Sequence, residues 1–242
     1  MRFATLGFVF QRPHQRSERA LEKPYRFAWW PLGIDLAPLL AEIAEQQPEW
    51  LESQWKWHVE SRFSLLRAGQ RSGYPGSELT NGHSINQPNL NRLPRLLHFL
   101  DTAFPVVPTL AWLGRIPEGG RIFTHVDNTQ HWDEHHRVHV PLITNPQARL
   151  CVDGRFLFLE PKRIWLLNNS VPHGALNRGP ARLHLVLDLP HFAGFDAWLA
   201  DGTLEAGEVD ATALTELDQN PLHSPAASSP FDSGRLARFL AQ

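Results

Sequence analysis

The chain has 242 residues, of which 42% are hydrophobic and 20% are charged, a composition that excludes a disordered chain and fits one domain more easily than two. The 23 Lys and Arg and the 25 Asp and Glu give a net charge of −2, so the protein has no basic field for a nucleic-acid backbone and no nucleic-acid partner is expected. Cys151 is the one cysteine; it excludes an internal disulfide and suits a reducing compartment, so we expect a cytoplasmic location.

No apolar stretch of the chain is long enough to cross a bilayer. Leu6–Phe10 is followed at once by polar residues, and Phe27–Leu36 is interrupted by Pro31 and Asp35. Because a membrane-spanning helix needs about 20 consecutive apolar residues, we expect neither a signal peptide, nor an anchor, nor a membrane partner.

The first 105 residues are predicted to carry helices. Apolar residues at helical spacing predict one helix within Ile34–Ile43, with Asp35 or a neighbour at its N-cap and an end before Pro48. The same spacing predicts a second helix over Leu93–Ala103. Between them, Arg71–Asn91 is rich in glycine, proline and asparagine, and we expect a long loop that closes over the functional site.

Tryptophans are concentrated in this first part of the chain. Five of the 9 lie between Trp29 and Trp57. Large aromatic side chains are usually buried, so packing of a helix against a sheet is the favoured interpretation. The alternative, an aromatic wall around a substrate, stays open.

From residue 106 onward the chain is predicted to form short strands separated by turns rich in proline, glycine and asparagine. Asp153-Gly154, between two apolar segments, is the strongest hairpin signal. Seven closely spaced strands predict a sandwich or a barrel, so the expected fold class is mainly β with flanking helices. The predicted strands are Val107–Leu113, Arg121–His125, Arg137–Leu142, Arg149–Val152, Arg155–Leu159, Arg163–Leu167 and Arg182–Leu189.

Beyond Pro190 the pattern becomes helical again. Short helices are predicted over Ala197–Leu204, Ala211–Leu217 and Ser233–Leu240, and His223–Ser229 is predicted to be a flexible connection. We therefore expect a single domain over residues 1–242, with a helix-bearing part (1–105), a β core (106–190) and a helical extension (191–242).

Histidines are concentrated in the strand-rich part, where seven of the 13 lie in residues 125–184. His125 and Asp127 have an informative spacing, because residues i and i+2 of a strand point to the same face and can bind one metal ion. His173, which follows an apolar strand and a polar loop, is the natural third ligand. Two histidines and one carboxylate with open coordination positions suit Fe(II), whereas zinc sites more often use thiolates or a third histidine.

Two of the predicted strands carry an arginine and a histidine on one face, Arg137 with His139 and Arg182 with His184. An arginine that points into a sheet interior is costly unless an anion meets it, and a guanidinium suits a carboxylate. The alternative for either strand is that the arginine faces solvent or pairs with a carboxylate of the chain. The candidate carboxylates are Asp153, Asp188 and Glu160.

Four motifs in this order resemble the aspartyl/asparaginyl β-hydroxylase family of 2-oxoglutarate- and Fe(II)-dependent dioxygenases, which also contains free-proline hydroxylases. The resemblance covers roughly residues 106–190, less than half of the chain. The motifs are His125-x-Asp127, Arg137-x-His139-x-Pro141-Leu142, Asn169-Ser170-Val171-Pro172-His173 and Arg182-Leu183-His184.

The resemblance implies a double-stranded β-helix, which is a jelly-roll or cupin-like barrel. It implies that Arg182 pairs with the distal carboxylate of 2-oxoglutarate and that Arg137 and His139 contact the carboxylate beside the keto group. This chain departs from some members at Gly114, where they place a serine on the cosubstrate, and animal protein-modifying members have glycine in place of the carboxylate ligand. The implied iron ligands are His125, Asp127 and His173.

The implied activity is the O₂-dependent decarboxylation of 2-oxoglutarate to succinate and CO₂, coupled to hydroxylation of an unactivated C–H bond. The expected substrate is a small molecule such as an amino acid, or a peptide or protein side chain. Two rival functions stay open, a cupin-like metal-dependent isomerase or lyase and a non-catalytic barrel that binds a dicarboxylate. The oligomeric state is open as well.

The polar stretch 128–136 lies between the first two motifs. It has the composition of a substrate entrance, but an exposed polar loop is the favoured interpretation.

Overall fold

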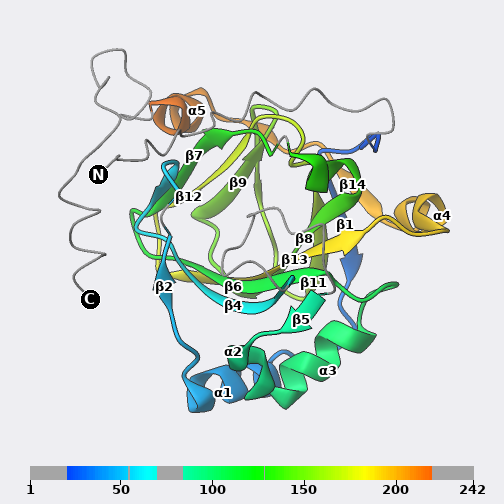
Figure 1. Ribbon diagram of the computed structural model, residues 1–242. Coiled ribbons are helices and arrows are strands. Elements are labelled where there is room, and N and C mark those ends of the chain that lie inside the picture. The colour runs from blue at the N-terminus through cyan, green and yellow to red at the C-terminus, as the bar shows by residue number, and fades with distance from the viewer. Residues whose placement is uncertain (1–20, 54, 70–83, 128, 220–242) are drawn as a thin grey trace, which may run out of the picture.

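Two facing antiparallel β-sheets form the centre of the protein (Figure 1). The computed structural model describes residues 21–53, 55–69, 84–127 and 129–219. Within them, the larger sheet has the strand order β14-β1-β11-β8-β13-β6-β4-β2, with β5 beside β4, and the smaller sheet has the order β15-β10-β9-β12-β7-β3.

The strands of the larger sheet are β1 Phe27–Pro31, β2 Leu51–Glu52, β4 Arg62–Gly69, β5 Ser84–Asn86, β6 Leu110–Ile116, β8 His135–Ile143, β11 Arg163–Leu167, β13 Arg182–Pro190 and β14 Thr203–Glu205. Those of the smaller sheet are β3 His58–Val59, β7 Arg121–His125, β9 Ala148–Val152, β10 Arg155–Phe158, β12 His173–Asn177 and β15 Glu208–Val209.

The path of the chain between the sheets identifies the fold. From β6 to β13 the chain crosses repeatedly from one sheet to the other, so that β11-β8-β13-β6 faces β10-β9-β12-β7. Eight antiparallel strands connected in this way form a jelly roll. The predicted fold class, a mainly β protein with a double-stranded β-helix, is confirmed.

Side-chain alternation in β13 separates the interior of the barrel from its outer face. Leu183, Leu185 and Leu187 belong to a large apolar core outside the barrel, whereas Arg182 and His184 line a cavity between the sheets. Because successive residues of a strand point to opposite faces, one strand serves both the packing and the site.

Three helices cover the outer face of the larger sheet, α1 Ala37–Gln46, α2 Pro88–Asn91 and α3 Pro94–Thr102 (Figure 1). Apolar residues of α1 and α3, such as Leu39 and Leu96, pack in the same core as the leucines of β13. Helix α4 Phe195–Ala200 contributes Phe195 to this core, and α5 Ala211–Asp218 lies against β7 and β12. None of the helices in the described part of the chain is long and apolar enough to span a bilayer.

The helix predictions agree with α1, α3 and α5 to within a few residues, but the prediction Ala197–Leu204 is wrong at its end, since α4 ends at Ala200 and Thr203–Glu205 forms β14. The loop prediction is also wrong in part. Ser84–Asn86 forms β5 against β4, and Pro88–Asn91 forms α2, because proline is favoured in the first turn of a helix. The rest of that loop, and the predictions over His223–Ser229 and Ser233–Leu240, lie outside the described residues.

All seven predicted strands exist, but the first is displaced. The prediction Val107–Leu113 is wrong at its start, since β6 begins at Leu110; Pro108 has no N–H to donate to a ladder. The Asp153-Gly154 turn joins β9 to β10 as predicted, with φ of 51° and 70°, the left-handed values that a tight hairpin requires.

Candidate metal centre and adjoining cavity

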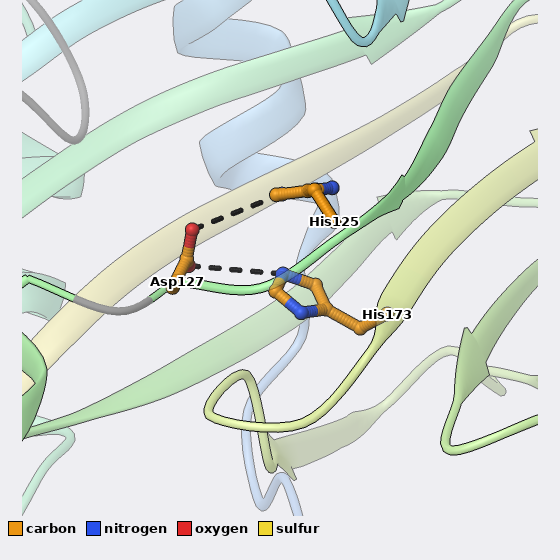
Figure 2. Close-up of side chains that lie close together, drawn as sticks. All are labelled: His125, Asp127 and His173. Atoms are coloured by element: carbon orange, nitrogen blue, oxygen red, sulfur yellow. Dashed lines mark ion pairs between the residues drawn. The ribbon is translucent and has the colours of Figure 1, made fainter. Parts of the chain in front are cut away.

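His125, Asp127 and His173 meet at one end of the smaller sheet (Figure 2). His125 ends β7, His173 begins β12, and the two residues are cross-strand partners. One ligand atom from each of the three residues lies within 4.8 Å of the others. The structure therefore brings together the three residues that the spacing and the resemblance selected.

Backbone carbonyls fix the orientation of both imidazoles. His125 Nδ1 lies 2.9 Å from the carbonyl oxygen of Phe123, and His173 Nδ1 lies 3.0 Å from that of Val171. A carbonyl oxygen can only accept, so each ring carries its proton on Nδ1 and leaves the Nε2 lone pair free. The two Nε2 atoms lie 3.8 and 3.7 Å from the Asp127 carboxylate oxygens.

The charge states of the three side chains suit metal binding. Burial lowers the pKa of His125, and it lowers the pKa of His173 to about 3, so both rings are neutral at pH 7. Burial alone raises the pKa of Asp127, but the neighbouring His173 and Arg137 outweigh it, and the pKa of the carboxyl lies below its ordinary value. Neutral imidazoles and an ionised carboxylate are the forms that bind metal ions.

A cavity between the sheets adjoins these three residues, and its lining includes Trp55, His58, Arg182 and His184. Trp57 stacks on His125 with ring centroids 4.8 Å apart. In contrast, Trp30 packs in the core outside the barrel. The packing interpretation therefore holds for Trp30, whereas Trp55 lines the cavity, where an aromatic wall around a substrate stays a prediction.

Arg182 is a buried cation without a carboxylate partner in the described part of the chain. Its side chain is 4% exposed, Nη1 lies 3.0 Å from His184 Nδ1, and Nε has no hydrogen-bond partner. Burial lowers the pKa of Arg182 to about 10, which leaves the guanidinium charged at pH 7. An uncompensated guanidinium in a cavity fits an anionic ligand.

Arg137 has a different environment, because the chain itself supplies its carboxylate. Nε and Nη2 donate to the two oxygens of Asp188 at 2.7 and 3.4 Å, while Nη1 lies 3.6 Å from Asp127. The guanidinium carbon lies 4.7 Å from the ring centroid of Trp112 and 4.3 Å from that of Trp132. The alternative of pairing within the chain thus holds for Arg137 and not for Arg182.

His139 lines the same cavity as Arg182. Its Nδ1 lies 3.3 Å from His184 Nδ1, and burial followed by the charge of Arg182 lowers the pKa of both imidazoles well below the ordinary value. Arg182, His184 and His139 therefore form one buried polar group in the cavity wall.

The favoured interpretation of the stretch 128–136 as an exposed polar loop is wrong for most of the residues there that the structure describes. His131, Trp132 and His135 are each at most 7% exposed, and His131 Nε2 bonds to Asp188 at 3.0 Å. Trp132 of this segment stacks on Arg137, and the bond of His131 reaches Asp188, 57 positions further along the chain, a contact that no local pattern predicts. Sequence reasoning also missed His58 and Trp57, for which the tryptophan cluster was the only signal.

The donor set fits a metal ion. Two neutral imidazoles and a carboxylate on one side leave positions open on the other, the arrangement that suits Fe(II) and not a structural zinc ion. The guanidinium of Arg182 lines the same cavity and supplies a buried positive charge that suits a carboxylate.

Comparisons with known proteins give one match in sequence. The model of the family described as aspartyl/asparaginyl β-hydroxylase matches residues 37–192, which is more than half of the chain. No curated protein matches the sequence.

Solved structures with a similar fold include two prolyl hydroxylases and one protein with 2-oxoglutarate bound. A prolyl hydroxylase from Trichoplax adhaerens, in complex with a peptide fragment of hypoxia inducible factor, is 12% identical over 68% of this chain and 83% of that chain, with a TM-score of 0.46. A prolyl-4-hydroxylase from Pseudomonas putida is 13% identical over 70% and 95%, with a TM-score of 0.42. HygX from Streptomyces hygroscopicus, with nickel and 2-oxoglutarate bound, is 15% identical over 77% and 92%, with a TM-score of 0.42. These similarities are low, so the functional assignment depends on the family match and on the site.

Proposed function

Since this chain belongs to the aspartyl/asparaginyl β-hydroxylase family of 2-oxoglutarate- and Fe(II)-dependent dioxygenases, we propose that it hydroxylates an unactivated C–H bond of an amino acid, peptide or protein side chain and releases succinate and CO₂. The predicted family and the predicted class of enzyme, with Fe(II), 2-oxoglutarate and O₂ as its cofactor and cosubstrates, are confirmed by the match. The observation that supports the finer proposal is the position of Arg182, which is buried without a carboxylate partner among the described residues and lines the same cavity as the His-Asp-His group.

His125, Asp127 and His173 would hold the iron. Their proximity and their charge states support this assignment. When bound, Fe(II) supplies the activation of O₂ that protein side chains cannot provide. The contribution of the chain is to hold the two Nε2 lone pairs and the carboxylate in place before the metal arrives, through the carbonyls of Phe123 and Val171.

Arg182 would bind the distal carboxylate of 2-oxoglutarate. A guanidinium can make two parallel hydrogen bonds to a carboxylate, and Arg182 has no acidic partner among the described residues that would compete. Arg137 and His139 would contact the carboxylate beside the keto group, as the resemblance implies. The guanidinium of Arg137 would then bind two carboxylates, that of Asp188 and the one beside the keto group of 2-oxoglutarate.

The cavity wall would receive the substrate and keep water out. Trp55, Trp112 and Phe63 provide apolar surface, and His58 and Ser61 provide polar groups joined by a 2.8 Å contact. A mostly apolar pocket with a few polar groups is typical of small-molecule and peptide-side-chain sites.

The test is O₂-dependent formation of succinate from 2-oxoglutarate by the Fe(II)-loaded protein, measured with a panel of free amino acids and peptides. We expect His125→Ala and Asp127→Ala to abolish succinate formation. Undiminished succinate in those variants would contradict the proposal. Turnover that does not require 2-oxoglutarate would favour the isomerase or lyase, and 2-oxoglutarate binding without O₂ consumption would favour the non-catalytic barrel.

A further inference from the structure

The two oxygens of the Asp127 carboxylate have different surroundings. Oδ2 accepts a hydrogen bond from Asn169 Nδ2 at 2.9 Å and lies 3.6 Å from Arg137 Nη1. Oδ1 has no hydrogen bond within the described ranges, and it faces His125 Nε2 at 3.8 Å. The carboxylate is thus held at one oxygen and free at the other.

Asn169 and Asp127 are joined by two hydrogen bonds. Besides the side-chain bond, its carbonyl oxygen accepts from the backbone N–H of Asp127 at 3.1 Å. Asn169 is 1% exposed and lies four residues before His173, in the loop that joins β11 to β12. The loop that delivers the third ligand therefore also positions the second.

Lys23 determines which way the Asn169 amide points. Lys23 Nζ donates to Asn169 Oδ1 at 2.9 Å, and Lys23 is only 6% exposed. An ammonium can only donate and a carboxylate can only accept. The amide must therefore turn its oxygen to Lys23 and its NH₂ to Asp127. A flipped amide would place its NH₂ against the Lys23 ammonium, donor against donor, and its oxygen against the Asp127 carboxylate, acceptor against acceptor.

The segment that carries Lys23 is fixed to the surroundings of the site. Asn168 Nδ2 donates to the carbonyl oxygen of Lys23 at 3.0 Å, and the Lys23 ammonium lies 5.5 Å from the ring centroid of Trp132, the indole that also stacks on Arg137. Lys23 precedes the part of the chain that matches the family, residues 37–192. Its connection to the metal centre is therefore a feature of this chain that the match does not cover.

We propose that Lys23 and Asn169 are positioning residues that hold Asp127 for metal binding through the relay Lys23 Nζ to Asn169 Oδ1 and Asn169 Nδ2 to Asp127 Oδ2. The inference rests on the proposed function to the extent that Asp127 is a metal ligand. The relay holds the carboxylate with Oδ1 toward His125 Nε2 and Oδ2 toward His173 Nε2, and without it the carboxylate can rotate. Partners of this kind change metal affinity by about 10- to 100-fold when they are removed.

The experiment measures the binding of Co(II), which has visible absorption bands that report its ligand set, to the full-length metal-free protein by calorimetry and absorption. We expect Lys23→Met and Asn169→Leu to weaken Co(II) binding by about 10- to 100-fold and to change the visible spectrum. Lys23→Arg, which keeps a cationic donor, should retain most of the affinity. Lys162→Met, which removes an ammonium from an exposed turn, is the matched control and should bind as the wild type does.

Two outcomes separate this inference from the proposed function. If Asp127→Ala binds Co(II) as tightly as the wild type, the assignment of Asp127 as a ligand fails. If Asp127→Ala loses affinity while Lys23→Met lowers the melting temperature and keeps the wild-type affinity and spectrum, the role of Lys23 is only structural and the positioning proposal is overturned. Lys23→Met decides the question even where Asn169→Leu does not fold.

Discussion

In the proposed function, Arg182 is the residue on which binding of the cosubstrate depends most directly. Replacing its buried guanidinium by the apolar side chain in Arg182→Met removes the charge that a dicarboxylate needs. A hydrogen bond to a charged group is worth about 1.5–3 kcal/mol, so we expect 2-oxoglutarate to bind about 10- to 150-fold more weakly. Calorimetry with the metal-loaded protein under argon measures this change.

The control for Arg182 is Arg178, whose guanidinium pairs with Glu216 at the surface at 2.7 Å. An exposed ion pair contributes little, so Arg178→Met should leave the affinity for 2-oxoglutarate unchanged. Equal affinities for 2-oxoglutarate in the wild type and in Arg182→Met would show that Arg182 does not bind the cosubstrate.

Asp188 makes stability depend on pH. It is fully buried and accepts hydrogen bonds from Arg137 and His131. Burial alone raises its pKa, but Arg137 and the bond from His131 outweigh burial and lower the pKa of Asp188 from 3.8 to about 2. A carboxyl with a lowered pKa stabilises the folded state above its unfolded pKa, and the contribution is lost as the pH falls toward the folded value.

We therefore expect Asp188→Asn to lower the free energy of unfolding by about 3 kcal/mol at pH 7, because it leaves Arg137 without its buried counter-charge. The difference from the wild type should shrink as the pH falls from about 4 to about 2. Urea unfolding followed at several pH values checks both statements. A difference that stays constant across this range would show that the Asp188 charge is not responsible.

At the residue scale, the spacing of the sequence predicted the candidate metal ligands. It did not predict the side chains that form hydrogen bonds with them or with their partners. His125 ends β7 and Asp127 follows two positions later, so the short spacing by itself predicts that the two side chains lie together. Lys23 and Asn169 are 146 positions apart, and nothing local in the sequence connects them. The pairing of Arg137 with Asp188 was one of several open alternatives, since only the register of β8 with β13 places the two side by side.

Turns are the elements that the sequence determines most locally, and the Asp153-Gly154 hairpin is the clearest of them. Gly154 has φ of 70°, and a Cβ there would meet its nearest neighbour, Leu214, at an ordinary 3.8 Å. The cost of Gly154→Ala is therefore conformational, and we expect a loss of about 1–2 kcal/mol in the free energy of unfolding. Urea unfolding measures it.

Gly33→Ala is the matched control, since Gly33 has no neighbour within 4 Å of a Cβ and no left-handed backbone. Its free energy of unfolding should stay close to that of the wild type. An equal loss in both variants would mean that the backbone conformation at Gly154 is not the cause.

Helix α5 packs against the smaller sheet and covers Cys151. Cys151 is 2% exposed and packs with Leu217 and Ala213 of this helix, and burial raises the pKa of its thiol to about 11. The thiolate is the reactive form, so we expect no reaction with a thiol reagent at pH 8 until urea unfolds the protein. Rapid labelling of the native protein would show that α5 does not protect the thiol.

Element predictions succeeded where an alternating or apolar run was long enough to stand out. Arg121–His125 and Arg163–Leu167 agree with β7 and β11 in both bounds. Strand β12 was missed, because His173–Asn177 contains Gly174 and Ala175, which have little strand propensity of their own. It forms because β7 and β9 pair with it on both sides, a tertiary effect that a local pattern does not contain.

At the scale of the whole molecule, the sequence predicted a β core with helices around it, and the resemblance implied that this core is a double-stranded β-helix. Composition and periodicity alone allowed either a sandwich or a barrel. The topology also uses strands from the first 105 residues, since β1 and β4 extend the larger sheet on its two sides. Pairing between such distant segments depends on the complete fold, so single-segment patterns could not predict it.

The functional centre is likewise a property of the whole fold. The two candidate ligand histidines lie in β7 and β12 of the smaller sheet, Asp127 follows β7, and Arg182 lies in β13 of the larger sheet. The cavity between the sheets joins them. The central claim is that one cavity binds Fe(II) through the first group and 2-oxoglutarate through the second.

Anaerobic titration of the metal-free protein with Fe(II) and 2-oxoglutarate, followed by visible absorption, tests that claim most directly. We predict a weak charge-transfer band that requires both additions, disappears in Asp127→Ala and needs a higher concentration of 2-oxoglutarate in Arg182→Met. A wild-type protein that shows no such band, or an Asp127→Ala variant that keeps it unchanged, would contradict the account.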